Sequence, residues 1–194
     1  MKNRALVFIV CLVAGAFATW AMAASQTSLA AHIDALEVAV RAELVEASLR
    51  LDDAFDAALF RRVDSGLPTR LVYQFELQKD RSSWFDQSVA DSQLQVIAMF
   101  NAVTGEYLIN FKHDGRLIES RVVRDHDALR AAMTELDAFP AFSTDSLDAS
   151  ARYRLRVRAE LGTRNLLAFI PRTVETPWAE SPKFTLATSR QVER

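Results

Sequence analysis

The stretch ARYRLRVRAEL, residues 151–161, alternates between apolar and charged side chains more regularly than any other part of the chain. Tyr153, Leu155, Val157 and Ala159 occupy every second position, and arginines stand between them. Because successive side chains of a β-strand point to opposite faces, this pattern predicts a strand with one buried face and one arginine face. A strand with one solvated face is typical of an antiparallel sheet.

The same period of two recurs on both sides of this stretch. Two helices are expected between the strands, one capped by Asp52 or Asp53 and ended by Gly66, and one capped by Asp125 or Asp127. We therefore predict an α+β fold of mostly antiparallel β structure, either a sheet or a two-layer β-sandwich with two short helices. Strands are predicted at residues 36–42, 45–51, 71–78, 94–100, 107–111 and 117–123, with a last one around residues 184–186.

Local signals fix several of the connections. The alternation changes phase near residues 43–44, which predicts a tight hairpin or a bulge there. Asp114-Gly115 predicts a two-residue type I′ turn, since both positions need positive φ. The second helix is expected to turn Leu129, Met133 and Leu136 inward, and a loop is expected from residue 139 to residue 150.

The N-terminus has the pattern of a secretory signal. Lys2 and Arg4 precede an uncharged apolar run at residues 5–18, and Ala21-Met22-Ala23 offers small residues for cleavage. We predict export and cleavage near Ala23, which places the mature protein in the periplasm.

The alternative is an uncleaved inner-membrane anchor, because residues 5–24 are long enough to cross a bilayer. The remaining boundaries are expected as a signal peptide at 1–23, a lead-in at 24–35, a single domain at 36–188 and a tail at 189–194. The one cysteine, Cys11, lies within the signal. A mature domain without cysteine excludes thiol catalysis, disulfides and cysteine-bound metals.

Other kinds of chemistry also lack a pattern in the sequence. The net charge of −2 gives no argument for nucleic acid binding. His32, His113 and His126 stand without a second ligand at metal-binding spacing. The acidic cluster at residues 52, 53 and 56 is interpreted as helix capping, and no nucleophile motif or phosphate-binding glycine loop is present. We predict a protein that is not an enzyme and has no metal or cofactor.

An arginine ladder is the most unusual feature, and it consists of Arg152, Arg154, Arg156 and Arg158. Neighbouring like charges on one face repel unless they are compensated. One hypothesis is a binding face for anionic lipid headgroups, with peripheral membrane contact, or for an acidic polymer or partner protein. The other is that acids on neighbouring strands neutralise the ladder. The acids expected to do so are Glu37, Glu43, Glu46, Glu76 and Glu119.

Two apolar segments allow both a structural and a binding interpretation. Trp84, Phe85 and Asp86 stand between two patterned strands, where the rings would close one end of the sheet and the carboxylate would accept backbone N–H groups. The alternative is an exposed aromatic corner that binds a ligand. Residues 166–171 would be either a core strand or an exposed apolar loop, and a core strand is favoured because large exposed apolar patches are rare.

Several quoted segments together resemble the DUF4390 family of uncharacterised exported bacterial proteins. The resemblance covers roughly residues 36–188, and its most specific pieces are the Gly-Leu-Pro and Trp-Phe-Asp motifs. It implies an exported compartment and no known activity. Because some relatives are encoded near membrane sensor kinases, it also implies such a kinase as a partner by analogy. The matching segments are SGLPTRLVYQFEL, RSSWFDQSVADSQLQV, FNAVTGEYLI, ALRAAMTEL, ARYRLRVRAEL and SPKFTL.

From these observations we expect a non-catalytic exported module of the bacterial cell envelope that binds or assists another protein. The alternative is a carrier or sensor of a small apolar or anionic ligand, held between the sheet and its helices.

Overall fold

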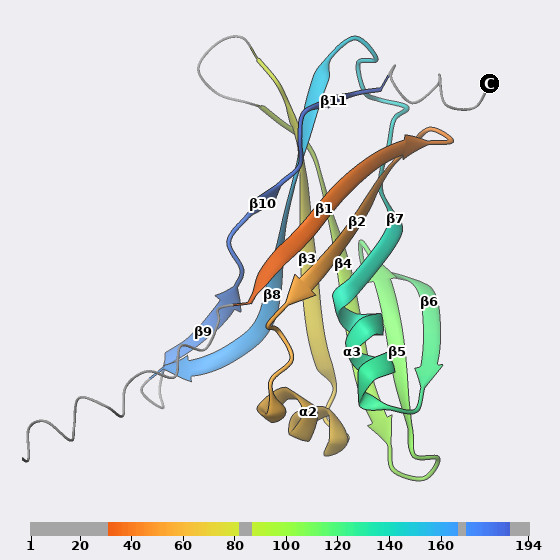
Figure 1. Ribbon diagram of the computed structural model, residues 1–194, viewed down its shortest axis with the longest axis vertical. Helices are drawn as coiled ribbons and strands as arrows, with labels where there is room; N and C mark the ends of the chain where they lie inside the picture. The colour runs from red at the N-terminus through yellow and green to blue at the C-terminus, as the bar shows by residue number, and fades with distance from the viewer. Residues whose placement is uncertain (1–30, 82–86, 167–169, 187–194) are drawn as a thin grey trace, which may run out of the picture.

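The computed structural model describes residues 31–81, 87–166 and 170–186, and it consists of two antiparallel sheets that face each other (Figure 1). The prediction of a mostly antiparallel α+β fold with two short helices is confirmed. The smaller sheet has the order β1-β2-β7. Its strands are β1 (His32–Arg41), β2 (Leu44–Asp52) and β7 (Glu135–Ser143).

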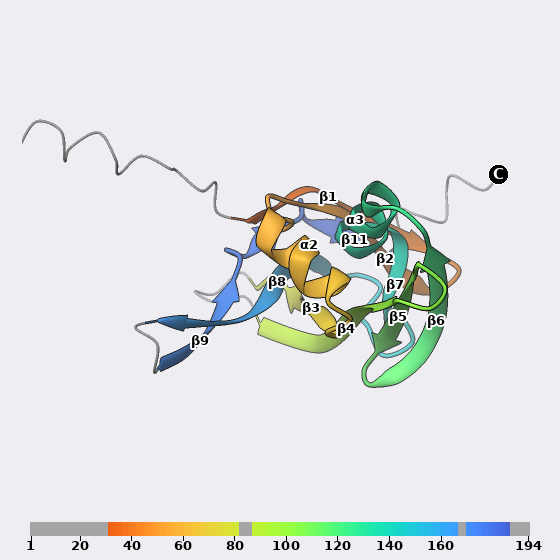
Figure 2. The same cartoon turned by 90° about the horizontal axis from the view of Figure 1, so that it is seen from below.

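The larger sheet has the order β10-β8-β3-β4-β5-β6, and β9 and β11 also pair with β8. The two helices, α2 (Ala57–Asp64) and α3 (His126–Thr134), lie at one end of the sandwich (Figure 2). The strands are β3 (Thr69–Lys79), β4 (Gln87–Asn101), β5 (Glu106–His113), β6 (Arg116–Val123), β8 (Arg152–Leu166), β9 (Ile170–Glu175), β10 (Ala179–Glu180) and β11 (Phe184–Thr185).

Both predicted hairpin turns are confirmed. Asp114 and Gly115 have φ of 47° and 80°, as a type I′ turn requires. The phase change near residue 43 is also a hairpin, because Ala42 and Glu43 have φ of 45° and 66° and join β1 to β2. A non-glycine residue in this left-handed region is strained, so this turn has a less favourable sequence than the Asp-Gly turn.

The helix caps are partly as predicted. Asp125 caps α3, and its side chain accepts a hydrogen bond from the N–H of Ala128. The prediction of Asp52 or Asp53 as the cap of α2 is wrong, since Asp56 occupies that position. Asp52 lies at the end of β2, where it accepts a hydrogen bond from Arg50 at 2.8 Å.

Strand β7 was not predicted, because the loop expected from residue 139 contains Pro140. Proline is tolerated at the edge of a sheet, and β7 is an edge strand next to β2. Leu136 therefore belongs to β7 and not to the inward stripe of α3. A bulge at Ala138, with φ of 47°, shifts the register between Ala47 and Leu49.

Two strands begin earlier than the pattern predicted. β1 starts at His32, so residues 32–34 of the expected lead-in already pair with β2, and β4 starts at Gln87 instead of residue 94. The first residues of both strands are mostly exposed. Exposed strand ends carry little apolar alternation, and this is why the sequence pattern missed them.

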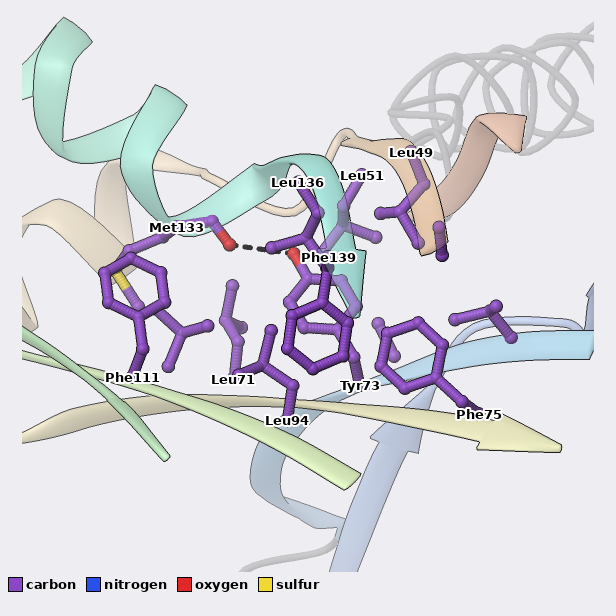
Figure 3. Close-up of a cluster of buried hydrophobic side chains, with 14 of the residues drawn as sticks. Leu49, Leu51, Leu71, Tyr73, Phe75, Leu94, Phe111, Met133, Leu136 and Phe139 are labelled. Carbon is purple, nitrogen blue, oxygen red and sulfur yellow. Dashed lines mark hydrogen bonds between the residues drawn. The ribbon is translucent and has the colours of Figure 1, made fainter. Parts of the chain in front are cut away.

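The core lies between the two sheets and is closed at one end by the helices (Figure 3). Tyr73 is fully buried, and its hydroxyl donates a hydrogen bond to the carbonyl of Met133 at 2.7 Å. Each large apolar side chain removed from water in this way stabilises the fold by about 1.5–3 kcal/mol. The fully buried side chains include Val45, Val63, Leu71, Tyr73, Leu77, Leu94, Ile109, Leu129, Met133, Tyr153 and Leu155.

Candidate functional site

The arginine ladder lies on the outer face of β8, as the alternation predicted, and every member has an acidic neighbour. Arg152 Nη2 lies 2.9 Å from Asp80 Oδ2, and Arg154 Nη1 lies 2.7 Å from Glu180 Oε2. Arg158 Nη1 lies 2.7 Å from Glu175 Oε2.

Arg156 is shared between two strands. Its guanidinium lies 3.2 Å from Glu180 and 3.5 Å from Glu76. The charges of the ladder are thus balanced within the chain, and this favours the hypothesis of neutralisation.

Only Glu76 of the five expected acids takes part in this neutralisation. Glu46 instead lies beside Arg41, and Glu119 lies beside Arg121. The reason is topological, since the neighbours of β8 in the sheet are β3, β9, β10 and β11. The other expected acids belong to β1, the β1–β2 turn, β2 and β6, none of which pairs with β8.

Trp178 covers the middle of the ladder. Its ring centroid lies 4.8 Å from the guanidinium carbon of Arg156 and 4.7 Å from that of Arg158, both within the range of a cation–π contact. Beside it lies an open cleft of about 340 Å³ between β3, β4 and the β5–β6 turn. Its lining residues bond to each other, as when Asp114 Oδ1 accepts the N–H of Gln93 at 2.9 Å. These hydrogen bonds hold the residues that line the cleft in place.

A second polar cluster, which we call the Asp64 cluster, joins both helices to β5 and consists of Asp64, Tyr107 and His126. One carboxylate oxygen of Asp64 accepts a hydrogen bond from the Tyr107 hydroxyl at 2.7 Å and lies 3.1 Å from Nε2 of His126. The ring of Phe60 packs on His126, with 4.5 Å between the centroids. No sequence pattern pointed to this cluster, because its members are far apart in the chain.

The Asp64 cluster contains the residue types of acid–base catalysis, but the pKa values of Asp64 and Tyr107 are both shifted away from neutral pH. Burial, helped by the Asp64 hydrogen bond, raises the pKa of Tyr107 to about 12. The Tyr107 hydrogen bond, aided by His126, lowers the pKa of Asp64. A catalytic base works best with a pKa near the operating pH. The hydrogen bonds of Asp64 to Tyr107 and His126 link α2 to β5 and to α3.

Strand β6 is the most exposed element of the larger sheet. Seven of its eight residues are exposed, and within the described part of the chain only β5 pairs with it. Leu117, Ile118 and Val122 are 59%, 51% and 55% exposed. A free edge presents unpaired backbone N–H and C=O groups, which form a template for another strand. The sequence predicted the strand, but not that its outer edge has no partner strand among the described residues.

An apolar row on the outer face of the sheet leads to this edge. Met99 of β4 lies opposite Leu108 of β5, which in turn lies opposite Val122 of β6. Met99 is 42% exposed. On the other face, Glu119 and Arg121 form an ion pair at 2.8 Å, and the Arg121 guanidinium lies over the ring of Phe111. Strand β6 therefore combines an open backbone, an apolar face and a charged face.

The predicted aromatic corner of Trp84, Phe85 and Asp86 lies outside the described residues. So does the middle of the apolar run at 166–171, of which β9 takes the residues from Ile170 onward. Within the described ranges, no group of three or more histidine, cysteine, aspartate or glutamate side chains is placed to hold a metal ion. No helix in this part of the chain is long and apolar enough to span a membrane.

Comparison with known families matches residues 29–191 to the model of DUF4390, a domain of unknown function. The chain belongs to the DUF4390 family. The match covers both sheets and both helices, so the described fold is that of the family domain in this chain. Comparison with curated proteins and with solved structures gave no match.

Proposed function

We propose that this DUF4390 protein is a non-catalytic binding module of the bacterial cell envelope that recognises other proteins by extending its larger sheet at β6. The open edge of β6 is the observation that carries the proposal. Strand addition supplies affinity through main-chain hydrogen bonds, and side chains along the edge supply specificity. A partner strand would gain the backbone groups of β6 and apolar contact with Ile118 and Val122.

The way in which the chain covers the other side of the larger sheet, at β8, supports this assignment. The C-terminal segment runs back along β8 and covers it with β9, β10 and β11. Between these short strands, the hydroxyls of Thr176 and Ser181 accept the N–H groups of Ala159 and Leu155 at 2.9 Å and 3.0 Å. The backbone of β8 thus has partners even in the gaps between the short strands. Strand β6 differs, because most of its side chains are exposed.

The packing of the interior favours a binding module over a carrier of a small ligand. Buried side chains from both sheets and from α3 meet where the carrier would hold its ligand (Figure 3), and Val63 of α2 belongs to the same buried cluster. The balanced arginine ladder likewise favours a protein partner over anionic lipid or polymer. A membrane sensor kinase is one partner class, by family analogy alone.

Export places the module where such partners are found. The charged start, the apolar run and Ala21-Met22-Ala23 support cleavage near Ala23. N-terminal sequencing of the protein from its native cells should find a chain that starts near Ala24. A membrane fraction that retains Met1 would instead indicate the anchor at residues 5–24.

Site-specific photocrosslinking in the native envelope tests the binding edge. A photoreactive residue at Ile118 or Val122 should give adducts, while the same residue at the exposed Arg62 of α2 should not. The β6 adducts should decrease when Glu119→Arg is added, because it reverses a charge along the edge. Equal crosslinking from β6 and from Arg62, or none from β6, would refute the proposal.

A further inference from the structure

We propose that β6 pairs with β6 of a second copy of this chain, antiparallel about a twofold axis at Ser120, and that this self-pairing occupies the binding edge until a partner displaces it. The inference rests on β6 being the binding edge proposed above. It names the first occupant of that edge and a means of regulating it.

The geometry of antiparallel strands restricts the possible registers. Residues directly opposite each other share the same hydrogen-bonding status, and the two strands are related by a twofold axis. In such a pair, one residue must therefore lie directly opposite its own copy in the second chain, and the twofold axis passes between these two copies. The register of β5 and β6 shifts between Phe111, which pairs with Glu119, and Lys112, which pairs with Leu117. Ile118 is therefore the extra residue of a bulge, and the regular part of β6 begins at Glu119.

The charges on β6 select one register among these. An axis at Glu119 would place Glu119 against its own copy, and an axis at Arg121 would do the same for the arginine. Like charges directly opposite each other are destabilising, whereas opposite charges contribute about 0.2–1 kcal/mol. An axis at Ser120 places each Glu119 opposite Arg121 of the other copy, which gives two ion pairs.

The same register joins the apolar groups. With Ser120 on the axis, Ile118, the residue of the bulge next to the regular part of β6, comes beside Val122 of the other copy. The row formed by Met99, Leu108 and Val122 would then continue into Ile118 of the second copy, and the reverse by symmetry. These side chains are among those that the single chain leaves exposed or half-buried.

The charges also explain why the edge would choose this partner. Charged side chains on the inner face of an edge strand oppose pairing with an arbitrary apolar strand. Glu119 and Arg121 are each 47% exposed and pair with each other in the single chain. Only a strand with the complementary charge order offers both of them a new partner, and β6 itself has that order.

Charge exchange provides a direct test. In sedimentation velocity over a concentration series, the purified protein should form a dimer reversibly. Glu119→Arg and Arg121→Glu should each raise the dimer dissociation constant about tenfold or more, because both ion pairs become like-charge contacts. Circular dichroism verifies that each variant keeps its fold.

Recombination of the two variants is the decisive step. An equimolar mixture of Glu119→Arg and Arg121→Glu should form a mixed dimer, because its two contacts are again complementary. The double variant with both exchanges should dimerise like the wild type. A wild-type protein that stays monomeric, or a mixture that does not recombine, would overturn the inference while leaving a β6 crosslink to another protein intact.

A cysteine on the axis tests the register independently. In a chain whose native cysteine is replaced by Cys11→Ser, Ser120→Cys should form an intermolecular disulfide under mild oxidation. Residues opposite each other in antiparallel strands lie within disulfide distance. Ser88→Cys, on exposed β4 away from this edge, is the matched control and should stay reduced. Equal crosslinking at both positions would contradict the proposed axis.

Discussion

The hydroxyl of Tyr73 supports the end of α3 from inside the core, and its removal is the sharpest test of the fold. Tyr73 is 0% exposed and donates to the carbonyl of Met133 at 2.7 Å (Figure 3). The last four carbonyls of a helix lack partners within the helix, and Met133 is the penultimate residue of α3. Burial raises the pKa of Tyr73 above its ordinary value, so the phenol keeps its proton and remains a donor at neutral pH.

Tyr73→Phe removes this donor and changes little else. The Met133 carbonyl would be left buried without a partner, and the space vacated by one oxygen is too small for a water molecule. The loss of the hydrogen bond and the stranded acceptor together cost about 1–3 kcal/mol. With a denaturant slope of about 2 kcal/mol/M, this corresponds to a urea midpoint lowered by roughly 0.5–1.5 M.

Equilibrium urea unfolding, followed by tryptophan fluorescence and circular dichroism, measures the change. Thr144→Val is the control, since it also removes a hydroxyl that donates to a carbonyl, that of Glu43. That carbonyl keeps a second donor, the N–H of Thr144 at 2.8 Å, so the variant should change stability by no more than about 0.5 kcal/mol. Equal midpoints for the two variants would refute the reasoning.

Three further predictions follow from the described contacts. The pKa of Asp64 is lowered in the folded chain, so its contribution to stability should be complete above the ordinary pKa of about 3.9 and should be lost as the pH falls through the lowered pKa. In Asp64→Asn, the free energy of unfolding should therefore decrease less steeply as the pH is lowered in the acid range. Replacing Ala42-Glu43 by Asn-Gly should raise the free energy of unfolding by about 1 kcal/mol, since both positions have positive φ, and an unchanged urea midpoint would contradict this. Single Arg154→Ala or Arg156→Ala changes should lower the free energy of unfolding by only about 0–1 kcal/mol. The wild-type protein should not co-sediment with anionic vesicles. Vesicle binding that is abolished both by high salt and by the double variant would show that the ladder is an anion site.

Much of the secondary structure could be predicted from the chain, because its causes are local. Alternation placed most strands, Asp125 and Gly66 marked helix ends, and Asp114-Gly115 specified its turn. The errors have local causes too. Pro140 hid an edge strand, and three nearby aspartates obscured which one caps α2.

The candidate site was harder to predict, because it depends on which strands become neighbours. The sequence correctly put four arginines on one face of β8, but it could not name their partners. Arg158 hydrogen bonds to Gln74, 84 residues earlier in the chain, and forms an ion pair with Glu175 from the returning C-terminal segment. Proximity of this kind is not encoded in the spacing of residues.

The sequence by itself determined the faces of the strands, because side-chain alternation is a property of the extended backbone alone. Only the tertiary structure decided which edges are covered. The C-terminal segment satisfies the backbone of β8, whereas no described segment reaches β6 beyond its hairpin with β5. Whether an N–H or C=O group has a partner depends on the position of distant chain in space, and for this reason the open edge of β6 appeared only once the sheets were assembled.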